Sequence, residues 1–297
     1  SSVVKELLEN SLDAGATAII LHLKNSGKDL ISITDNGDGM SAHDARSSII
    51  RHATSKIRTF TDLYNLHTLG FRGEALASIA AVSELSIITK TTDDIKATKI
   101  ECHGGIIVTE TAAAHNQGTT IEVKNIFFNT PARKKFLKTD TVEMSHIIDI
   151  VTNYALLNPK ITFKLTHENH EIISAPKTDD LRDRIASIFG HEIASPLLEI
   201  KLNNSNSPYK IVGFISKPHD CRSDKNIQTI FLNNRFIKNN DISRAVYEGY
   251  HARLFVGKHP IFIINITVDP LTIDVNIHPQ KTEVKIENKE ELIREII

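Results

Sequence analysis

The chain has 297 residues, a length typical of two ordinary domains, and 40% hydrophobic residues, enough for a sizeable core. A formal net charge of −1 excludes a uniformly basic nucleic-acid binder and leaves a local basic patch open. We find no run near the roughly 18 apolar residues of a membrane span, no signal-peptide pattern, and no metal-site spacing of Cys102 and Cys221. These features predict a reducing location, cytoplasmic in a bacterium or nuclear in a eukaryote.

The first stretch, from Val3 to Gly15, has apolar residues at helical spacing and a glycine that favours a helix stop. At about 100° per residue, Glu6 and Asn10 lie on one polar stripe and can face one object, while Lys5 and Glu9 are expected to point to solvent. A carboxylate and an amide in this arrangement suit a general base and a metal ligand. Taken alone, the helix favours the simpler interpretation, a polar boundary of the core.

Two strands are predicted next, over 17–24 and 30–34, and the second runs into the sequence DNGDG at 35–39. Glycine permits positive φ and lets the backbone come close to a ligand. One interpretation is an ordinary tight turn with acidic residues. The other is a rigid loop that holds Asp35 in a pocket, where its carboxylate could accept a hydrogen bond from an exocyclic amine.

A helix is expected from Ser41, and the glycine-rich loop at 69–74 leads into a second helix. Backbone N–H groups and the helix dipole at such a start form an anion site, although two glycines before a helix are a weak signal. Further strands are predicted at 85–89, 98–102, 106–109 and 119–124.

The segment 129–138 gathers four cationic residues around one aromatic residue, usually the mark of a solvated face and less often of a phosphate contact. A helix at 141–157 and a hairpin at 161–174 follow, and the domain boundary is placed near Ala175 and Pro176. The remaining pattern predicts helices at 179–189 and 243–254 and strands at 197–202, 209–216, 227–232 and 261–268.

Six motifs occur in order: KELLENSLDAG, DNGDG, RHATSK, GFRGEALASI, GTT and NTPARKKFL. Together they resemble the N-terminal ATPase region of the MutL mismatch-repair proteins, within the gyrase–Hsp90–histidine kinase–MutL (GHKL) ATPase class. The resemblance implies an α+β fold of two domains. Residues 1–176 would form a GHKL-type sandwich with a mixed, mainly antiparallel sheet and helices on one face, and residues 177–297 a ribosomal-protein-S5-like domain. It also implies ATP and Mg²⁺ as ligands.

The resemblance assigns roles residue by residue. Glu6 matches the general base, Asn10 the Mg²⁺ ligand and Asp35 the carboxylate that accepts from the adenine amino group. Gly39 would pack under the nucleotide, and Thr119 would lie near the base. The residues expected along the phosphates and in the lid over them are Thr54, Lys56, Arg72, Gly73, Glu74, Ala75 and Leu76.

The sequence VNIHPQKTEV resembles a family loop whose lysine reaches the γ-phosphate, which makes Lys281 a second candidate catalytic residue. The DNA-binding candidates are Arg133, Lys134, Lys135 and Arg235, and Asn234 departs from the glycine or lysine more common in the turn before Arg235.

The implied function is that of an ATP-hydrolysing switch in DNA mismatch repair. Mg-ATP binding would drive formation of a homodimer or paralogue heterodimer, followed by binding of DNA, a mismatch-recognition protein and other repair factors. Two alternatives stay open: another ATPase of the class, chaperone-like or topoisomerase-like, and a non-catalytic interaction module gated by nucleotide.

Overall fold

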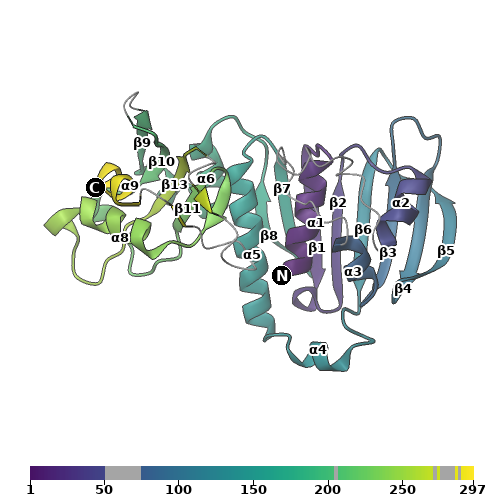
Figure 1. Cartoon of the computed structure of the whole chain (residues 1–297). Coiled ribbons are helices and arrows are strands. Elements are labelled where there is room, and N and C mark those ends of the chain that lie inside the picture. The colour runs from purple at the N-terminus through teal and green to yellow at the C-terminus, as the bar shows by residue number, and fades with distance from the viewer. Residues whose placement is uncertain (51–74, 204–206, 270–272, 275–284, 287–288) are drawn as a thin grey trace. The chain divides into compact units, whose positions relative to one another are not determined.

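The computed structural model describes residues 1–50, 75–203, 207–269, 273–274, 285–286 and 289–297. They form two compact units, 1–188 and 189–297, each treated by itself below. The elements of the first unit (Figure 1) are α1 (Ser2–Asp13), β1 (Ala18–Lys24), η1 (Asn25–Gly27), β2 (Leu30–Asp35), α2 (Ala42–Ile49), α3 (Ala75–Ala80), β3 (Glu84–Lys90), β4 (Ala97–His103), β5 (Ile106–Ala113), β6 (Gly118–Lys124), α4 (Pro131–Lys135), α5 (Asp140–Leu157), β7 (Thr162–His167), β8 (His170–Ala175) and α6 (Leu181–Phe189).

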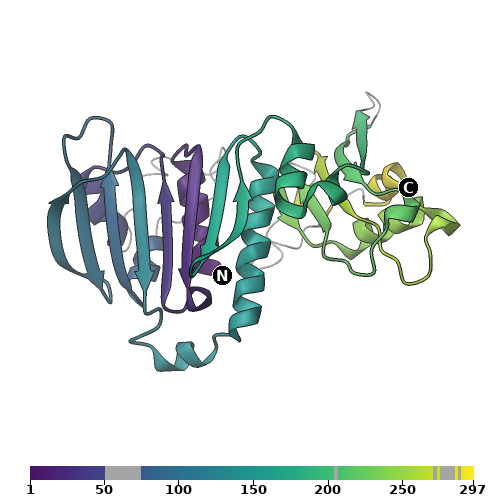
Figure 2. The same cartoon turned by 180° about the vertical axis from the view of Figure 1, so that it is seen from behind.

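The first unit is built on an eight-stranded sheet with the strand order β5-β4-β3-β6-β2-β1-β7-β8. Its neighbours pair antiparallel except for β1 and β7, which are parallel. Helices α1, α2, α3 and α5 pack on one face (Figure 1), and the strands of the other face lie uncovered in Figure 2. The predicted mixed, mainly antiparallel sheet with helices on one face is confirmed.

Helix α1 contributes three fully buried apolar residues to this core. Val4, Leu7 and Leu8 are at most 1% exposed and belong to the apolar cluster that includes the buried residues of β1, which alternate with more exposed ones. This burial drives the helix onto the sheet, because apolar surface is removed from water along one stripe. Gly15, at φ +70°, follows the helix, as the sequence predicts.

The expectation that Glu9 points to solvent is wrong. Its side chain is 7% exposed and accepts a hydrogen bond of 2.5 Å from the hydroxyl group of Tyr154 on α5, with Lys5 Nζ 3.8 Å away. Helix α5 packs against α1 and covers this side of it. The helical spacing of residues 3–15 carries no information about a neighbour so distant in the sequence.

Helix α6 belongs to the first unit through Arg184, whose side chain is fully buried. The guanidinium group donates hydrogen bonds to the carbonyl oxygens of Ala175 (2.7 Å), Pro159 (2.6 Å) and Ile161 (2.7 Å). The division between the units therefore falls after Ile188, later in the chain than the boundary expected at 176. Burial desolvates the guanidinium group and lowers the pKa of Arg184 from its ordinary value.

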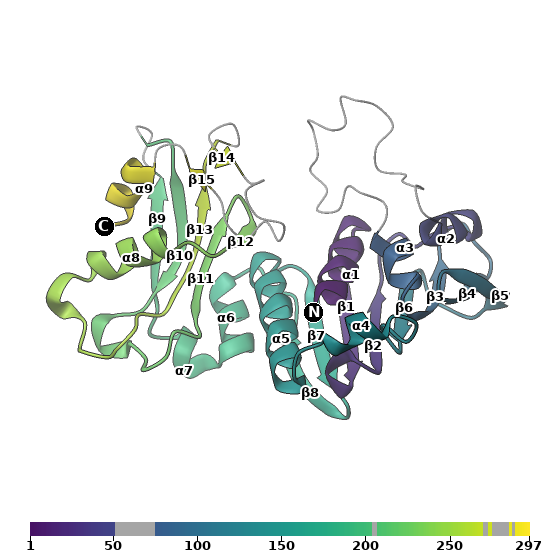
Figure 3. The same cartoon turned by 60° about the horizontal axis from the view of Figure 1, so that its bottom comes forward.

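The second unit consists of α7 (His191–Ala194), β9 (Leu198–Asn203), β10 (Lys210–Ile215), η3 (Pro218–Asp220), β11 (Gln228–Leu232), β12 (Arg235–Ile237), α8 (Asn240–Gly249), η4 (His251–Arg253), β13 (Phe262–Thr267), β14 (Ile273–Asp274), β15 (Lys285–Ile286) and α9 (Lys289–Ile296). Its five-stranded sheet has the order β12-β11-β13-β10-β9, with β11 and β13 parallel. Helices α8 and α9 lie together beside this sheet (Figure 3) and supply Ile242, Val246 and Leu292 to its core.

Helix α8 is displaced from the predicted range of 243–254. The Asn239 side chain accepts hydrogen bonds of 3.0 Å from the N–H groups of Asp241 and Ile242, so the helix begins at Asn240. It ends at Gly249, and His251 has φ +48°. No helix in the described part of the chain combines the length and apolar character needed to span a membrane.

Candidate functional site

The loop that follows β2 is fixed to helix α1. The Ser11 hydroxyl group donates to Asp35 Oδ2 at 2.8 Å, the Gly37 N–H donates to Asp35 Oδ1 at 3.0 Å, and the Asp38 N–H donates to the Ala14 carbonyl oxygen at 2.9 Å. Asp35 itself is 8% exposed. These bonds hold the Asp35 carboxylate at the end of β2 against α1, and its place in a ligand pocket stays a prediction.

The surroundings of Asp35 act on its pKa in opposite directions. Burial raises the pKa above its ordinary value, because the charged form is desolvated. Hydrogen bonds from Gly37, from Ser11 and from the backbone N–H of Thr119 favour the carboxylate and lower the pKa. Burial is the larger effect. Both oxygens of this buried carboxylate accept hydrogen bonds, and each can accept one more from a ligand donor.

Two glycines of DNGDG are required by close contacts. A Cβ atom on Gly37 would lie 2.6 Å from the carbonyl oxygen of Ala14. Gly39 has φ +72°, and a Cβ atom there would overlap the carbonyl oxygen of Lys90 at the end of β3. The spacing DNGDG thus sets the distance of the loop from both α1 and β3.

Threonines close the other side of the loop. Thr119 on β6 lies opposite Asp35 in the strand register, and its hydroxyl group is 3.0 Å from that of Thr89 on β3. The Met40 N–H donates to Thr89 Oγ1 at 2.8 Å. Thr89 and Ser11 were not among the predicted site residues. A polar residue at the buried end of β3, and a serine next to Asn10, are the signals that could have found them.

Glu6 and Asn10 are both half-buried on α1, one helical turn apart, and Asn10 immediately precedes Ser11. The Asn10 amide has no hydrogen-bond partner among the residues that the structure describes. An amide oxygen one helical turn from a carboxylate suits a hard cation such as Mg²⁺, which prefers oxygen ligands. Within the described ranges, no group of three or more His, Cys, Asp or Glu side chains could hold a metal ion.

Helix α3 packs against α1 and begins at Ala75, so Ala75 and Leu76 lie on an element that contacts the Glu6 helix. The other phosphate candidates lie outside the described residues, namely Thr54, Lys56, Arg72, Gly73, Glu74 and Lys281.

Three of the DNA-binding candidates share one short element. Arg133, Lys134 and Lys135 are exposed on α4, and Phe136 directly after it is 86% exposed. Arg235 is half-buried on β12 of the second unit, after a turn in which Asn233 and Asn234 both have positive φ. Asparagine tolerates this left-handed geometry, which accounts for Asn234 in place of glycine.

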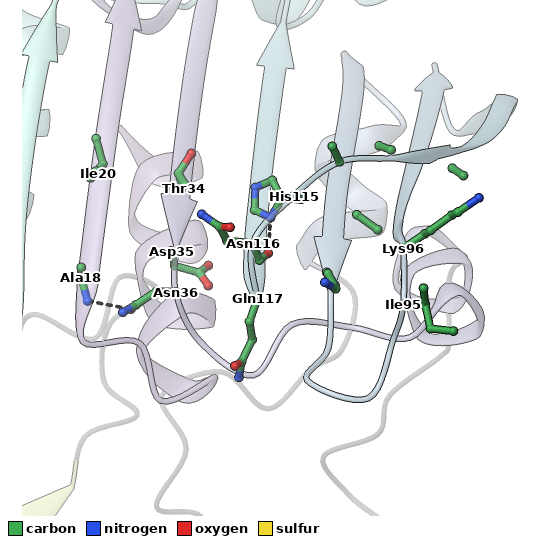
Figure 4. Close-up of a pocket in the computed structure, with 15 residues that line it drawn as sticks. Ala18, Ile20, Thr34, Asp35, Asn36, Ile95, Lys96, His115, Asn116 and Gln117 are labelled. Atoms are coloured by element: carbon green, nitrogen blue, oxygen red, sulfur yellow. Dashed lines mark hydrogen bonds between the residues drawn. The ribbon is translucent and has the colours of Figure 1, made fainter.

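A hollow of about 1010 Å³ opens on the uncovered face of the eight-stranded sheet, lined by Thr34, Asn36 and His115 among others (Figure 4). His115 Nε2 lies 2.8 Å from Thr120 Oγ1, which lies 2.9 Å from Thr34 Oγ1. Asp35 also lines this hollow, at the end of β2.

Two family models match the chain. The family described as "Histidine kinase-, DNA gyrase B-, and HSP90-like ATPase" matches residues 1–126, and that described as "DNA mismatch repair protein, C-terminal domain" matches residues 185–297.

Curated relatives and solved structures agree with these matches. The DNA mismatch repair protein MutL of Streptococcus thermophilus is 43% identical over 293 residues, which is 99% of this chain and 45% of the relative. MutL of Lactococcus lactis is 44% identical over 293 residues, or 99% of this chain and 44% of the relative. A crystal structure of the N-terminal domain of a DNA repair protein superposes with a TM-score of 0.81 at 30% identity, covering 98% of this chain and 90% of that one. The Aquifex aeolicus MutL ATPase domain complexed with ADP gives 0.69 at 25% identity and covers 91% of each chain.

The fold and the carboxylate site define an ATPase domain of the histidine kinase, gyrase and Hsp90 class, followed by an S5-like domain, as predicted. The chain belongs to the MutL family of DNA mismatch repair proteins. It spans 45% of the length of the Streptococcus relative.

Proposed function

We propose that this chain binds Mg-ATP in the site between α1 and the Asp35 loop and hydrolyses it. The observation that carries the proposal is the buried Asp35 carboxylate, which α1, β6 and two close-packed glycines hold in one position. An acceptor fixed in this way suits the adenine amino group. One related structure is described as complexed with ADP, which supports an adenine nucleotide as the ligand.

Glu6 is proposed to orient and deprotonate the attacking water, a contribution worth about 10²–10⁴-fold in rate for a positioned base. Asn10 would hold Mg²⁺, which neutralises charge on the phosphate oxygens when it is bound. Gly39 lets the loop approach the nucleotide, and Thr119 lies beside Asp35. Thr54, Lys56, the lid residues 72–76 and Lys281 complete the proposal on the strength of the family resemblance.

Nucleotide binding is proposed to act as a switch. ATP would promote dimerisation, and the dimer would bind DNA through Arg133, Lys134, Lys135 and Arg235, together with a mismatch-recognition protein and other repair factors. DNA binding of this kind is largely independent of sequence and falls steeply with salt. Because the relatives named above are bacterial, we place the protein in the cytoplasm.

The proposal is tested by measuring ADP and ATP-analogue affinity with Mg²⁺, and single-turnover ATP hydrolysis, on the full chain. Asp35→Asn should weaken nucleotide binding by about tenfold or more, because one hydrogen bond to a charged group contributes about 1.5–3 kcal/mol. Lys177→Ala, an exposed change on the same unit, should leave affinity unchanged.

Two results would contradict the proposal. Equal affinity of Asp35→Asn and the wild-type chain would remove the adenine contact. Nucleotide binding without any single-turnover hydrolysis would favour the non-catalytic, nucleotide-gated module.

A further inference from the structure

Two segments of the second unit form one surface, here called the basic tip, which consists of residues 217–225 and 251–259. The Arg222 N–H donates to the His259 carbonyl oxygen at 2.9 Å, and the His259 N–H donates to that of Arg222 at 2.7 Å. This bridge joins the segment after η3 to the loop after α8. The charges of both segments therefore act at one place.

The basic tip is cationic in a chain whose net charge is −1. It carries five lysines and arginines, namely Lys217, Arg222, Lys225, Arg253 and Lys258, against two aspartates, Asp220 and Asp224. Arg222 Nε is 3.1 Å from Asp224 Oδ2, which offsets one charge. Lys225, Arg253 and Lys258 are exposed and have no acidic partner in the described part of the chain.

Apolar side chains project from the same surface. Phe255 is 68% exposed and Val256 is fully exposed. They sit on a turn closed by the Lys258 N–H, which donates to the Phe255 carbonyl oxygen at 3.0 Å, and Gly257 at φ +73° shapes that turn. Two neighbouring apolar side chains held clear of the core by a turn are placed to contact a partner.

The base of the basic tip is ordered by side-chain contacts. The Tyr247 hydroxyl group lies 2.8 Å from His259 Nδ1 and accepts a hydrogen bond of 2.9 Å from Gln228 Nε2. Lys225 Nζ lies 5.9 Å from the centre of the Tyr247 ring, a weak cation–π distance. Helix α8, strand β11 and the bridge between Arg222 and His259 therefore support both the cations and the apolar turn.

We propose that the basic tip binds the DNA duplex, with Lys225, Arg253 and Lys258 on phosphates and Phe255 against a base step in the minor groove. Apolar wedges flanked by lysine or arginine are how proteins enter that groove. This inference rests on the proposed DNA-binding function and adds a contact separate from α4 and Arg235. An acidic protein or an anionic lipid surface would use the same charges, and the experiment below tells the lipid case apart directly.

The experiment measures binding of the full chain to a fluorescent DNA duplex over a series of salt concentrations, and to phosphatidylserine vesicles in parallel. Each cation that neutralises a phosphate of B-DNA contributes about 0.9 to the slope of log affinity against log salt. The combined change of Lys225, Arg253 and Lys258 to alanine should therefore reduce the slope by about 2.7. Phe255→Ala removes no charge, so it should lower affinity several-fold and leave the slope unchanged.

Matched controls use residues with the same exposure elsewhere. Changing Lys177, Lys201 and Lys210 together to alanine removes three exposed lysines and should alter neither affinity nor slope beyond a general charge effect. Ile95→Ala removes an apolar side chain that is 92% exposed and should leave binding unchanged. Circular dichroism of each variant shows whether the fold is intact.

Each outcome decides the question. If an α4 variant of Arg133, Lys134 and Lys135 lowers the slope and the basic-tip variant does not, the basic tip is not a DNA contact, although DNA binding stands. If the basic-tip variant loses binding only to phosphatidylserine vesicles, the surface is a lipid contact and the inference is overturned. If the wild-type chain binds no duplex, both the inference and the DNA-binding function fail.

Discussion

Asp35 in the first unit and the cations of the basic tip in the second show two ways of presenting charge. Asp35 is 8% exposed, and Ser11, Gly37 and Thr119 donate to it, so its position is fixed before any ligand arrives. Lys225, Arg253 and Lys258 are exposed at the ends of flexible side chains. A buried, fixed group supports recognition of one ligand geometry, whereas exposed cations support binding to any phosphate backbone. Substitutions in the two regions should therefore have very different sizes and readouts.

The largest effect is expected at Glu6, on the helix that holds Asp35. Glu6→Ala should lower single-turnover ATP hydrolysis by about 10²–10⁴-fold, because the positioned base is lost, while nucleotide affinity is retained. The control is Glu9→Gln on the same helix, which should change stability and spare the chemical step, since Glu9 bonds to Tyr154. If Glu6→Ala hydrolyses ATP at the normal rate, Glu6 is not the general base.

The next effect concerns the close packing of the Asp35 loop. Gly39→Ala should destabilise the chain by about 1–3 kcal/mol from backbone strain alone, with a further cost from the overlap with Lys90, as measured by urea unfolding. Gly15 is a matched control, because it has φ +70° and no atom within 4 Å of an added Cβ. Equal losses for Gly39→Ala and Gly15→Ala would show that the contact with Lys90 does not matter.

A smaller effect should appear in the pH dependence of nucleotide binding. Burial raises the pKa of Asp35, so acidification protonates it at a higher pH than an exposed aspartate. ADP affinity should fall as the pH drops through this raised pKa, and Asp35→Asn should flatten that dependence. The effect on folding has the opposite sign: the stability contributed by protonated Asp35 is present below its ordinary pKa and is lost as the pH rises through the raised value. Identical affinity profiles for both chains would contradict this account.

The smallest effect is expected at the exposed cations. Replacing Lys225, Arg253 or Lys258 singly by alanine should change the free energy of unfolding by no more than about 0.5 kcal/mol, because exposed side chains contribute little to the fold. Thermal unfolding measures this directly. A loss of several kcal/mol in the free energy of unfolding at any of the three would mean that the basic tip is a structural part of the core. The difference between these cations and Asp35 would then not hold.

Residues close together in the sequence made the centre of the site predictable. The spacing of Glu6 and Asn10 on an apolar-faced helix, and the glycines of DNGDG after a strand, both reflect local backbone geometry. The structure has the helix, and Gly37 and Gly39 make the close contacts that glycine permits. Ser11, Thr89 and the bond between Glu9 and Tyr154 escaped prediction because each depends on a partner from another element.

Boundaries in the second half were less predictable for a similar reason. The apolar pattern suggested a helix at 243–254, but the cap by Asn239 and the positive φ of His251 set its ends at Asn240 and Gly249. Side-chain capping and single-residue backbone geometry decide such limits, and neither leaves a periodic signal. The short elements α7 and β12 were missed because four and three residues carry too little pattern.

Arg184 also bears on how the protein can be divided in the laboratory. Its guanidinium group supplies donors to the carbonyl oxygens of Pro159, Ile161 and Ala175, all of which precede α6. A shortened ATPase fragment that stops at Pro176 would lack Arg184, so these three carbonyl oxygens would lose their hydrogen-bond donor. A fragment that runs through Phe189 keeps helix α6 and Arg184. We expect this longer fragment to fold on its own when it is expressed.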